Sequence, residues 1–359
     1  MAGTGELLGE AAMMSFLRSR RQQPPAMTLE GVLGPNGLLD EAKGLRVEAP
    51  DALAVAADGR LLFSSGSRVM ALRSWESEPE AWAGFDAPVT ALCCGPGGLV
   101  AVGLAGGRLA MFDASGKPVE GWTLPAGRLA SVVDCVFRSD DELLLVDCGY
   151  GADAELLARA SWDDDGHGQL VSLRRSGETR IVMSGLHCPM GVCLDAGGNA
   201  LVSLLERAGI VDATGKAVQS GYPGYPGRLR RTATGYALAF LSRRDPLIEF
   251  LKTEHAFVAE MKAKIAPRHW IAPRINPEFS HDFPIELGAT RLFGEVKPWA
   301  PSFSYGLVVE TDGKLMPTGS FQSRANGQRH AICDVAVWDD ALVAVSKASG
   351  EILNLGAGA

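Results

Sequence analysis

The sequence predicts an all-β protein folded as a six-bladed β-propeller, and three observations support this fold class. A short unit recurs in which a Gly/Asp turn precedes an apolar run, and most copies lie about forty residues apart, as expected for propeller blades. Several copies continue into a hairpin with an SGK-like turn, as at residues 114–117. Between residues 29 and 245 no long segment has a helical period. The six units occupy residues 58–63, 97–102, 141–146, 197–202, 234–239 and 340–345.

Length and charge narrow the class of protein further. A chain of 359 residues could form two average domains, but a closed propeller uses this length as one. The net charge of −8 argues against nucleic-acid binding, which needs a dense basic face. No run of eighteen apolar residues is present, so we expect no transmembrane segment. The oligomeric state stays open.

The first 28 residues are predicted to be a flexible tail. An apolar patch at residues 11–17 precedes Arg18, Arg20 and Arg21, which is the wrong order for a secretory signal. A helix that docks on a membrane surface or a partner is the alternative. Seven cysteines, an odd number with no C-x-x-C pair, fit buried thiols in a reducing compartment. We therefore expect a cytoplasmic protein.

One segment departs from the strand pattern. Apolar residues recur at helical spacing between residues 247 and 265, Pro267 ends that pattern, and an aromatic, proline-rich stretch follows to residue 301. We expect residues 245–300 to form a cap between the fifth and sixth repeat units, within a propeller of residues 29–359. Residues 27–33 are expected to supply the strand that closes the last blade.

Four segments resemble a known group of proteins. Residues 49–55 (APDALAV), 188–195 (CPMGVCLD), 224–231 (GYPGRLRR) and 242–247 (SRRDPL) are similar to segments of the strictosidine synthase-like and gluconolactonase/paraoxonase-type six-bladed propellers. The resemblance covers about residues 29–355 and implies a ligand site at the mouth of the axial tunnel. It does not by itself specify an activity.

The chain departs from that group at its calcium ligands. By the resemblance, the glutamate position holds Asp51, and three asparagine positions hold Val133, Met190 and Arg228. An isopropyl group, a thioether and a guanidinium cannot ligate calcium, and a fixed cation repels it. We therefore expect no metal ion and no other cofactor, which leaves calcium-dependent lactone or ester hydrolysis as an alternative only.

The glutamate base of the strictosidine synthases is also replaced, because Cys333 stands at its position. The resemblance then implies a metal-independent, strictosidine synthase-like enzyme acting on a small anionic metabolite. A non-catalytic propeller that binds a ligand or a protein is the alternative from another class. Whether the chain is an enzyme, and whether a lyase/synthase or a hydrolase, stays open.

The resemblance also implies which residues surround the ligand. Imidazole titrates near neutrality, so His187 is the first candidate for proton transfer, and Arg228 either binds an anion or forms a structural ion pair that replaces the metal. A Cys333–His330 pair is disfavoured, because residues three apart on a strand face opposite ways. The candidate catalytic residues are His187, Asp51 and Asp134, and the candidate substrate-binding residues are Arg228, Met190, Tyr225, Cys333 and His330.

Overall fold

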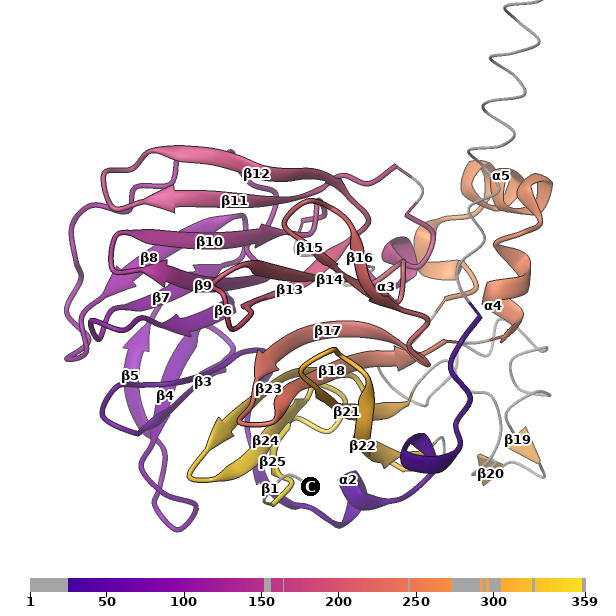
Figure 1. Cartoon of the computed structure of the whole chain (residues 1–359), viewed down its shortest axis with the longest axis horizontal. Coiled ribbons are helices and arrows are strands. Elements are labelled where there is room, and N and C mark those ends of the chain that lie inside the picture. Colours follow the sequence, from indigo (N-terminus) through magenta and orange to yellow (C-terminus); the bar gives the residue numbers. More distant parts are fainter. Residues whose placement is uncertain are drawn as a thin grey trace, which may run out of the picture.

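The structure is a computed structural model, and the predicted six-bladed propeller is confirmed (Figure 1). It describes residues 25–151, 156–163, 165–244, 246–272, 291–292, 295–296, 305–324 and 327–356. The innermost strands of the six blades contact one another in a ring, in the order β2, β6, β9, β13, β17, β23 and back to β2. Their residue ranges are Leu53–Val55, Val89–Cys94, Asp134–Ser139, Pro189–Leu194, Gly224–Arg231 and Ile332–Trp338.

Each blade is an antiparallel sheet that continues outward from its inner strand. Blade one adds β3 (Leu61–Ser65), β4 (Arg68–Leu72) and β5 (Glu80–Gly84), and blade two adds β7 (Val100–Leu104) and β8 (Arg108–Phe112). Blade three adds β10 (Glu142–Asp147), β11 (Gly168–Arg174) and β12 (Thr179–Leu186), and blade four adds β14 (Ala200–Leu204), β15 (Gly209–Asp212) and β16 (Ala217–Ser220). Blade five adds β18 (Gly235–Arg243), β21 (Gly306–Asp312) and β22 (Pro317–Ser323), and blade six adds β24 (Ala341–Ser346), β25 (Glu351–Asn354) and β1 (Lys43–Arg46).

The six sequence repeats correspond to the second strand of each blade. These strands are buried along almost their whole length, because a neighbouring blade packs on either face. The turns before β3, β7 and β14 contain Gly59, Gly98 and Gly198 at positive φ, which side chains disfavour. The strongest pattern in the sequence therefore marks the most buried layer of the fold.

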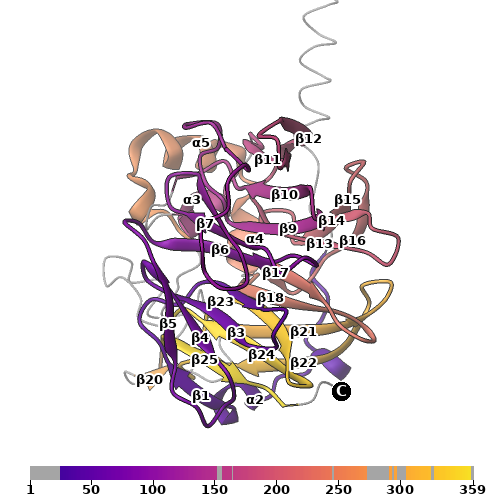
Figure 2. The same cartoon turned by 90° about the vertical axis from the view of Figure 1, so that its left-hand side faces the viewer.

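Closure of the ring corrects one prediction. The N-terminal side of the chain does complete the last blade, but through β1, which pairs with β25 from Lys43↔Asn354 to Arg46↔Glu351 (Figure 2). Residues 27–33, predicted to be this strand, instead end in the short helix η1 (Gly31–Leu33) against blade five. There Gln322 Nε2 donates to the Leu33 carbonyl at 2.9 Å. The apolar residues of this segment pack as a loop beside the sheet.

The helical segment is divided in two and lies inside a blade. It forms α4 (Pro246–Leu251) and α5 (His255–Lys264), followed by the short helix η2 (Pro267–His269), between β18 and β21 of blade five. The insertion therefore lies between the fifth and sixth repeat units, within the fifth blade, where it separates the second strand from the third. Its apolar side packs on residues from α3 (Leu156–Ala160) and the following turn, at one end of the propeller (Figure 1). The shared cluster contains Trp162, Ile248, Met261 and Trp270.

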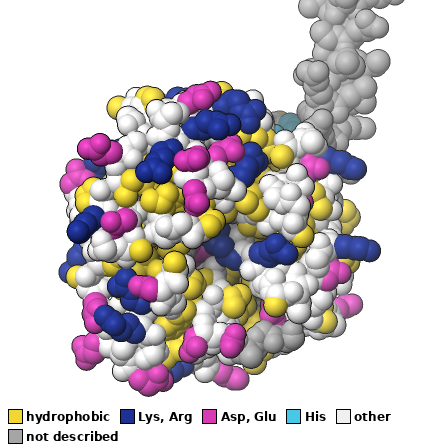
Figure 3. Space-filling view, turned by 60° about the vertical axis from the view of Figure 1, so that its left-hand side comes forward, with side chains coloured by type: hydrophobic (Ala, Val, Ile, Leu, Met, Phe, Trp, Pro, Cys, Tyr) yellow, Lys and Arg dark blue, Asp and Glu magenta, His cyan; other side chains and the backbone are white. Residues whose placement is uncertain are grey.

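Parts of the predicted cap and tail lie outside the described residues. Between residues 273 and 304 only β19 (Arg291–Leu292) and β20 (Glu295–Val296) are described, so the cap remains a prediction. Residues 1–24 are likewise outside the described part. Within the described residues, no helix is both long and apolar enough to cross a membrane. On the face seen in Figure 3, basic and acidic side chains are interspersed, without a continuous basic field.

Candidate active site

An arginine occupies the centre of the ring. Arg228 comes from β17, and its guanidinium donates to backbone carbonyls of four other blades: Asp51 O, Thr90 O at 2.6 Å, Val133 O at 2.9 Å and Cys333 O at 3.5 Å. The arginine is 4% exposed. Because it joins blades one, two, three, five and six, it acts as a central brace of the propeller.

Asp51 and Lys347 flank this brace. Asp51 Oδ1 lies 3.1 Å from Arg228 Nη2, and Asp51 Oδ2 lies 2.9 Å from Lys347 Nζ. Burial alone would raise the pKa of Asp51, but the charges of Lys347 and Arg228 outweigh it and lower that pKa. The carboxylate is therefore held in its charged form.

A second arginine connects two more buried carboxylates. Arg230 lies 2.8 Å from Asp134 and 3.1 Å from Asp334. Each carboxylate also accepts a backbone N–H of a following blade, from Val192 and from Leu53 respectively, at 2.9 Å. Burial raises the pKa of Asp334, and the two arginines oppose that shift. These contacts tie neighbouring inner strands to one another.

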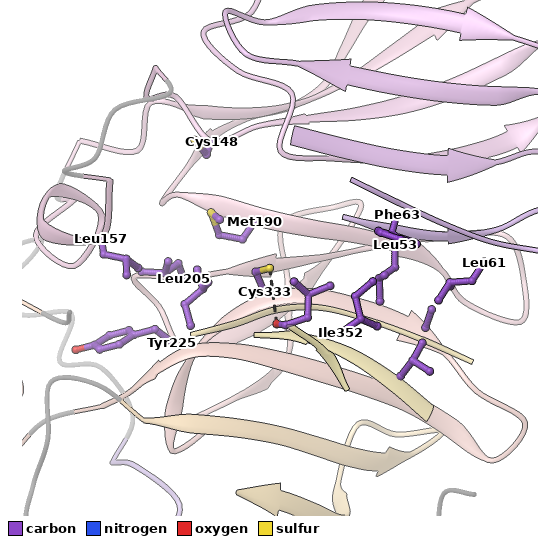
Figure 4. Packing of buried hydrophobic residues seen from close by; sticks show 14 of the residues in the cluster. Leu53, Leu61, Phe63, Cys148, Leu157, Met190, Leu205, Tyr225, Cys333 and Ile352 are labelled. Atoms are coloured by element: carbon purple, nitrogen blue, oxygen red, sulfur yellow. Dashed lines mark hydrogen bonds between the residues drawn. The ribbon is translucent and has the colours of Figure 1, made fainter. Parts of the chain in front are cut away.

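Three predicted binding residues lie in an apolar cluster beside this charged layer. Met190, Tyr225 and Cys333 belong to one buried cluster around the axis (Figure 4). The Cys333 thiol donates to Asp51 O at 3.1 Å, and burial raises its pKa to about 12. The Tyr225 hydroxyl donates to Glu249 of α4 at 2.8 Å. Their role in binding a substrate stays a prediction.

The axial residues do not fit a calcium ion. The point where carbonyl oxygens of four blades converge is taken by the Arg228 guanidinium, which supplies hydrogen-bond donors where a cation would need oxygen ligands. Among the described residues, no three His, Cys, Asp or Glu side chains are grouped so as to hold a metal.

His187 lies apart from the axial residues. Its Nδ1 is 2.9 Å from the Asp163 carbonyl, and its Nε2 is 3.1 Å from Arg207 Nη2. A carbonyl only accepts, so Nδ1 carries the proton and Nε2 is left as the acceptor nitrogen. Arg207 Nη2 lies 3.1 Å from Nε2 and 3.4 Å from Nδ1, so it is placed against the ring and leaves the Nε2 lone pair open. Within the described residues, the hydrogen-bond partners of His187 are Asp163 and Arg207, and not Asp51, Asp134 or Arg228.

His330 is in a third place. It is buried, its Nε2 lies 2.9 Å from the Arg324 carbonyl, and burial lowers its pKa. The thiol of Cys333 points to Asp51 O and not to this imidazole. The structure thus brings the predicted axial residues together and separates both histidines from them.

The pair of His187 and Arg207 lines a cleft of about 680 Å³ between blades three and four. One wall is the outer strand β12 and the other is β15 with β16. The apolar part of the lining is Val182, Leu186, Leu204, Ile210 and Val211. The polar part is Ser184, His187, Arg207, Thr214, Gln219 and Ser220. A cleft that combines apolar walls with several polar groups is a usual form of a small-molecule site.

Arg207 was missed in the sequence, although it adjoins Glu206. Arg207 Nε is 3.0 Å from Glu206 Oε2, and the arginine side chain is 31% exposed while the glutamate is 6% exposed. In the sequence, two adjacent residues of opposite charge look the same whether they lie on the surface or are partly buried. The signal that could have indicated Arg207 is the position of this Glu-Arg pair, shortly after an apolar strand-like run.

Comparison with solved structures identifies the fold. A presumed gluconolactonase matches with a TM-score of 0.52 at 14% identity, over 87% of this chain and 91% of the other. A gluconolactonase from Xanthomonas campestris, described as important in glucose secondary metabolic pathways, matches with a TM-score of 0.52 at 13% identity, over 92% and 94% of the two chains. The chain has the gluconolactonase-type propeller fold. The resemblance proposed from the sequence is confirmed at this level. No protein-family profile and no curated protein matches the sequence.

Proposed function

We propose that this propeller is a metal-independent hydrolase that opens a lactone or ester of a small organic acid in the cleft between blades three and four. The observation that carries the proposal is the His187–Arg207 pair, with the Nε2 and Nη2 atoms 3.1 Å apart in that cleft. The fold it shares with two gluconolactonases supports the choice of substrate class.

The geometry supplies the two groups that ester hydrolysis needs. The Asp163 carbonyl fixes the His187 tautomer, so Nε2 can take a proton from water. Arg207 can turn its guanidinium to the substrate carbonyl oxygen and stabilise the negative charge that develops there. The water oxygen bonds to the carbonyl carbon, the ring C–O bond breaks, and the proton passes from His187 to the leaving alkoxide. The products are an alcohol and a carboxylic acid, which releases its proton to solvent, or a hydroxy acid from a lactone.

This proposal keeps two elements of the sequence interpretation and leaves one aside. Metal independence and a small anionic metabolite, here the product, are retained. The strictosidine synthase-like condensation is not, because Cys333 at the position of the catalytic base has a pKa raised to about 12 by burial. Proton transfer by Asp51 or Asp134 stays a prediction, although ion pairs already hold both carboxylates.

A calcium-dependent lactonase is the second candidate, favoured by the likeness to the gluconolactonase structures and opposed by the position of Arg228. The third is a non-catalytic propeller that binds a carboxylate in the same cleft. All three share the fold but differ in their need for His187 and for metal.

The deciding experiment is hydrolysis of a panel of five- and six-membered lactones and aryl esters, with EDTA present. We expect activity that falls about a hundredfold or more in His187→Asn, as for loss of a general base. His167→Asn is the matched control, because His167 is 60% exposed, pairs with Asp165 and does not line the cleft. Activity that appears only with calcium would favour the second candidate. Absence of hydrolysis, with carboxylate binding lost in Arg207→Met, would favour the third.

A further inference from the structure

A line of charged side chains runs from the inserted helix α4 to Arg207. Glu206 is buried, and its carboxylate lies 3.0 Å from Arg207 Nε on one side and 3.5 Å from Lys252 Nζ on the other. Lys252 directly follows α4 and lies 3.4 Å from Glu249 Oε1. The cleft residue is therefore connected to the insertion through a single buried carboxylate.

Several side-chain contacts hold α4 in place. Glu249 accepts from the Tyr225 hydroxyl at 2.8 Å and pairs with Arg244 at 2.6 Å, so both β17 and the end of β18 hold the helix. Lys252 Nζ also lies 5.2 Å from the centre of the Tyr225 ring, a favourable cation–π distance. Arg244 is only 3% exposed. The Lys252 ammonium is therefore held in one position, from which it can orient the Glu206 carboxylate.

The insertion also reaches the residue that holds His187. Lys262 of α5 donates to the Trp162 carbonyl at 2.8 Å, and the next residue, Asp163, provides the carbonyl that binds His187 Nδ1 at 2.9 Å. The indole of Trp162 in turn donates to the Ile271 carbonyl at 2.8 Å. Both members of the cleft pair thus depend on residues 246–271.

We propose that Glu206 and Lys252 are positioning residues, through which the insertion in blade five orients Arg207 toward His187 in the cleft. This inference rests on the proposed function of that cleft. Arg207 is partly exposed and has a flexible side chain, so without a fixed partner at Nε its fork would sample solvent. The ion pair with Glu206 holds Nε and leaves Nη2 against the His187 ring. Lys252 keeps the buried Glu206 charge compensated and in place.

The test compares Glu206→Gln and Lys252→Met with a matched control in the same insertion. Lys264→Met removes an equivalent lysine, 70% exposed and paired with Glu260 at 2.7 Å, with no contact to the cleft. We expect Glu206→Gln and Lys252→Met to lower kcat about tenfold with a smaller change in KM, because Arg207 acts on the transition state. Lys252→Arg should recover most of the rate, and Lys264→Met should match the parent protein.

A second measurement does not require hydrolysis. The NMR signal of Arg207 Nε–H reports its ion pair with the Glu206 carboxylate, 3.0 Å away, and we expect it to shift in Glu206→Gln and in Lys252→Met but not in Lys264→Met. An unchanged signal in both variants would overturn the inference, whatever the activity. A shifted signal in a protein that hydrolyses no lactone or ester would support the positioning role and refute the proposed reaction. If Glu206→Gln does not fold, Lys252→Met decides the question alone.

Discussion

The axis and the cleft each contain an arginine, and the two arginines are used differently. At the axis three cations, Arg228, Arg230 and Lys347, face the three carboxylates Asp51, Asp134 and Asp334. The guanidinium of Arg228 is almost fully enclosed and bonded to backbone carbonyls. In the cleft, Arg207 is 31% exposed and has the His187 imidazole at its Nη end.

This difference indicates that the axial charges stabilise the fold, whereas Arg207 is available to a ligand. In a buried and balanced group of charges, each charge is already paired and is not available to a ligand. Loss of one member leaves its partners uncompensated. The partly exposed Arg207 shares the Glu206 carboxylate with Lys252, so it contributes less to folding, and its Nη end can exchange the imidazole for a substrate. We therefore expect axial substitutions to affect unfolding, and cleft substitutions to affect binding and turnover.

The largest expected effect is at the centre of the ring. Arg228→Met should lower the free energy of unfolding by about 3–5 kcal/mol, because it leaves buried carboxylates and carbonyl oxygens without their donor. Urea unfolding followed by tryptophan fluorescence measures this. The matched change in the cleft, Arg207→Met, should lower the same free energy by less, because Lys252 still compensates the buried Glu206 carboxylate. Equal losses in the two variants would remove the distinction between the regions.

A smaller, pH-dependent effect is expected for Asp51→Asn. The pKa of Asp51 is lowered in the folded protein from its ordinary value of 3.8, so its charge stabilises the fold above that value. This contribution is lost as pH falls through the lower, folded pKa. At neutral pH the variant should lose about 1–3 kcal/mol, as for a hydrogen bond to a charged partner.

The measurement is urea unfolding of the parent and the variant between pH 7 and pH 3. The difference between the two proteins should shrink toward the acid end. A double-mutant cycle with Lys347→Met separates the share of the lysine from that of Arg228, since both contact the same carboxylate. A difference that grows on acidification would contradict the lowered pKa.

The sequence predicted the ring of blades because its signal comes from the most buried strands, such as β3 and β14, where turn glycines and apolar runs are both required. The closing strand was assigned wrongly because β1 (KGLR) is an outer strand with mostly exposed residues, and so lacks an apolar pattern. Apolar residues 27–33 gave a stronger but misleading signal. Burial, not strand formation, is what the pattern detects.

For the candidate site, the axial residues could be predicted from the sequence and the cleft could not. Arg228 and Asp51 could be placed near the axis because Arg228 lies within an inner strand and Asp51 lies just before one, and inner strands meet there. The cleft could not be foreseen. It requires Asp163, His187 and Arg207, from three separate connections, to meet where two neighbouring blades pack. Such a contact depends on the relative position of the blades, which no local pattern encodes.

The smallest expected effect is that of calcium. Millimolar calcium or EDTA should leave the melting temperature of the parent protein unchanged, because Arg228 already satisfies the axial carbonyls. Arg228→Asn gives the sharper comparison. It removes the cation and leaves the Asp51 carboxylate with carbonyl oxygens from blades one, two and three facing the axis, together with an amide oxygen from Asn. Oxygen ligands of this kind suit calcium, which takes about six to eight including water.

We therefore expect Arg228→Asn to be destabilised and then partly restored by calcium but not by magnesium, whose octahedral geometry is less adaptable. Thermal melting with each ion measures both effects, with Arg207→Asn as the control that should not respond. Stoichiometric calcium in the parent protein, with a clear loss of stability in EDTA, would show that the axis binds metal despite Arg228 and would return lactone hydrolysis there to first place.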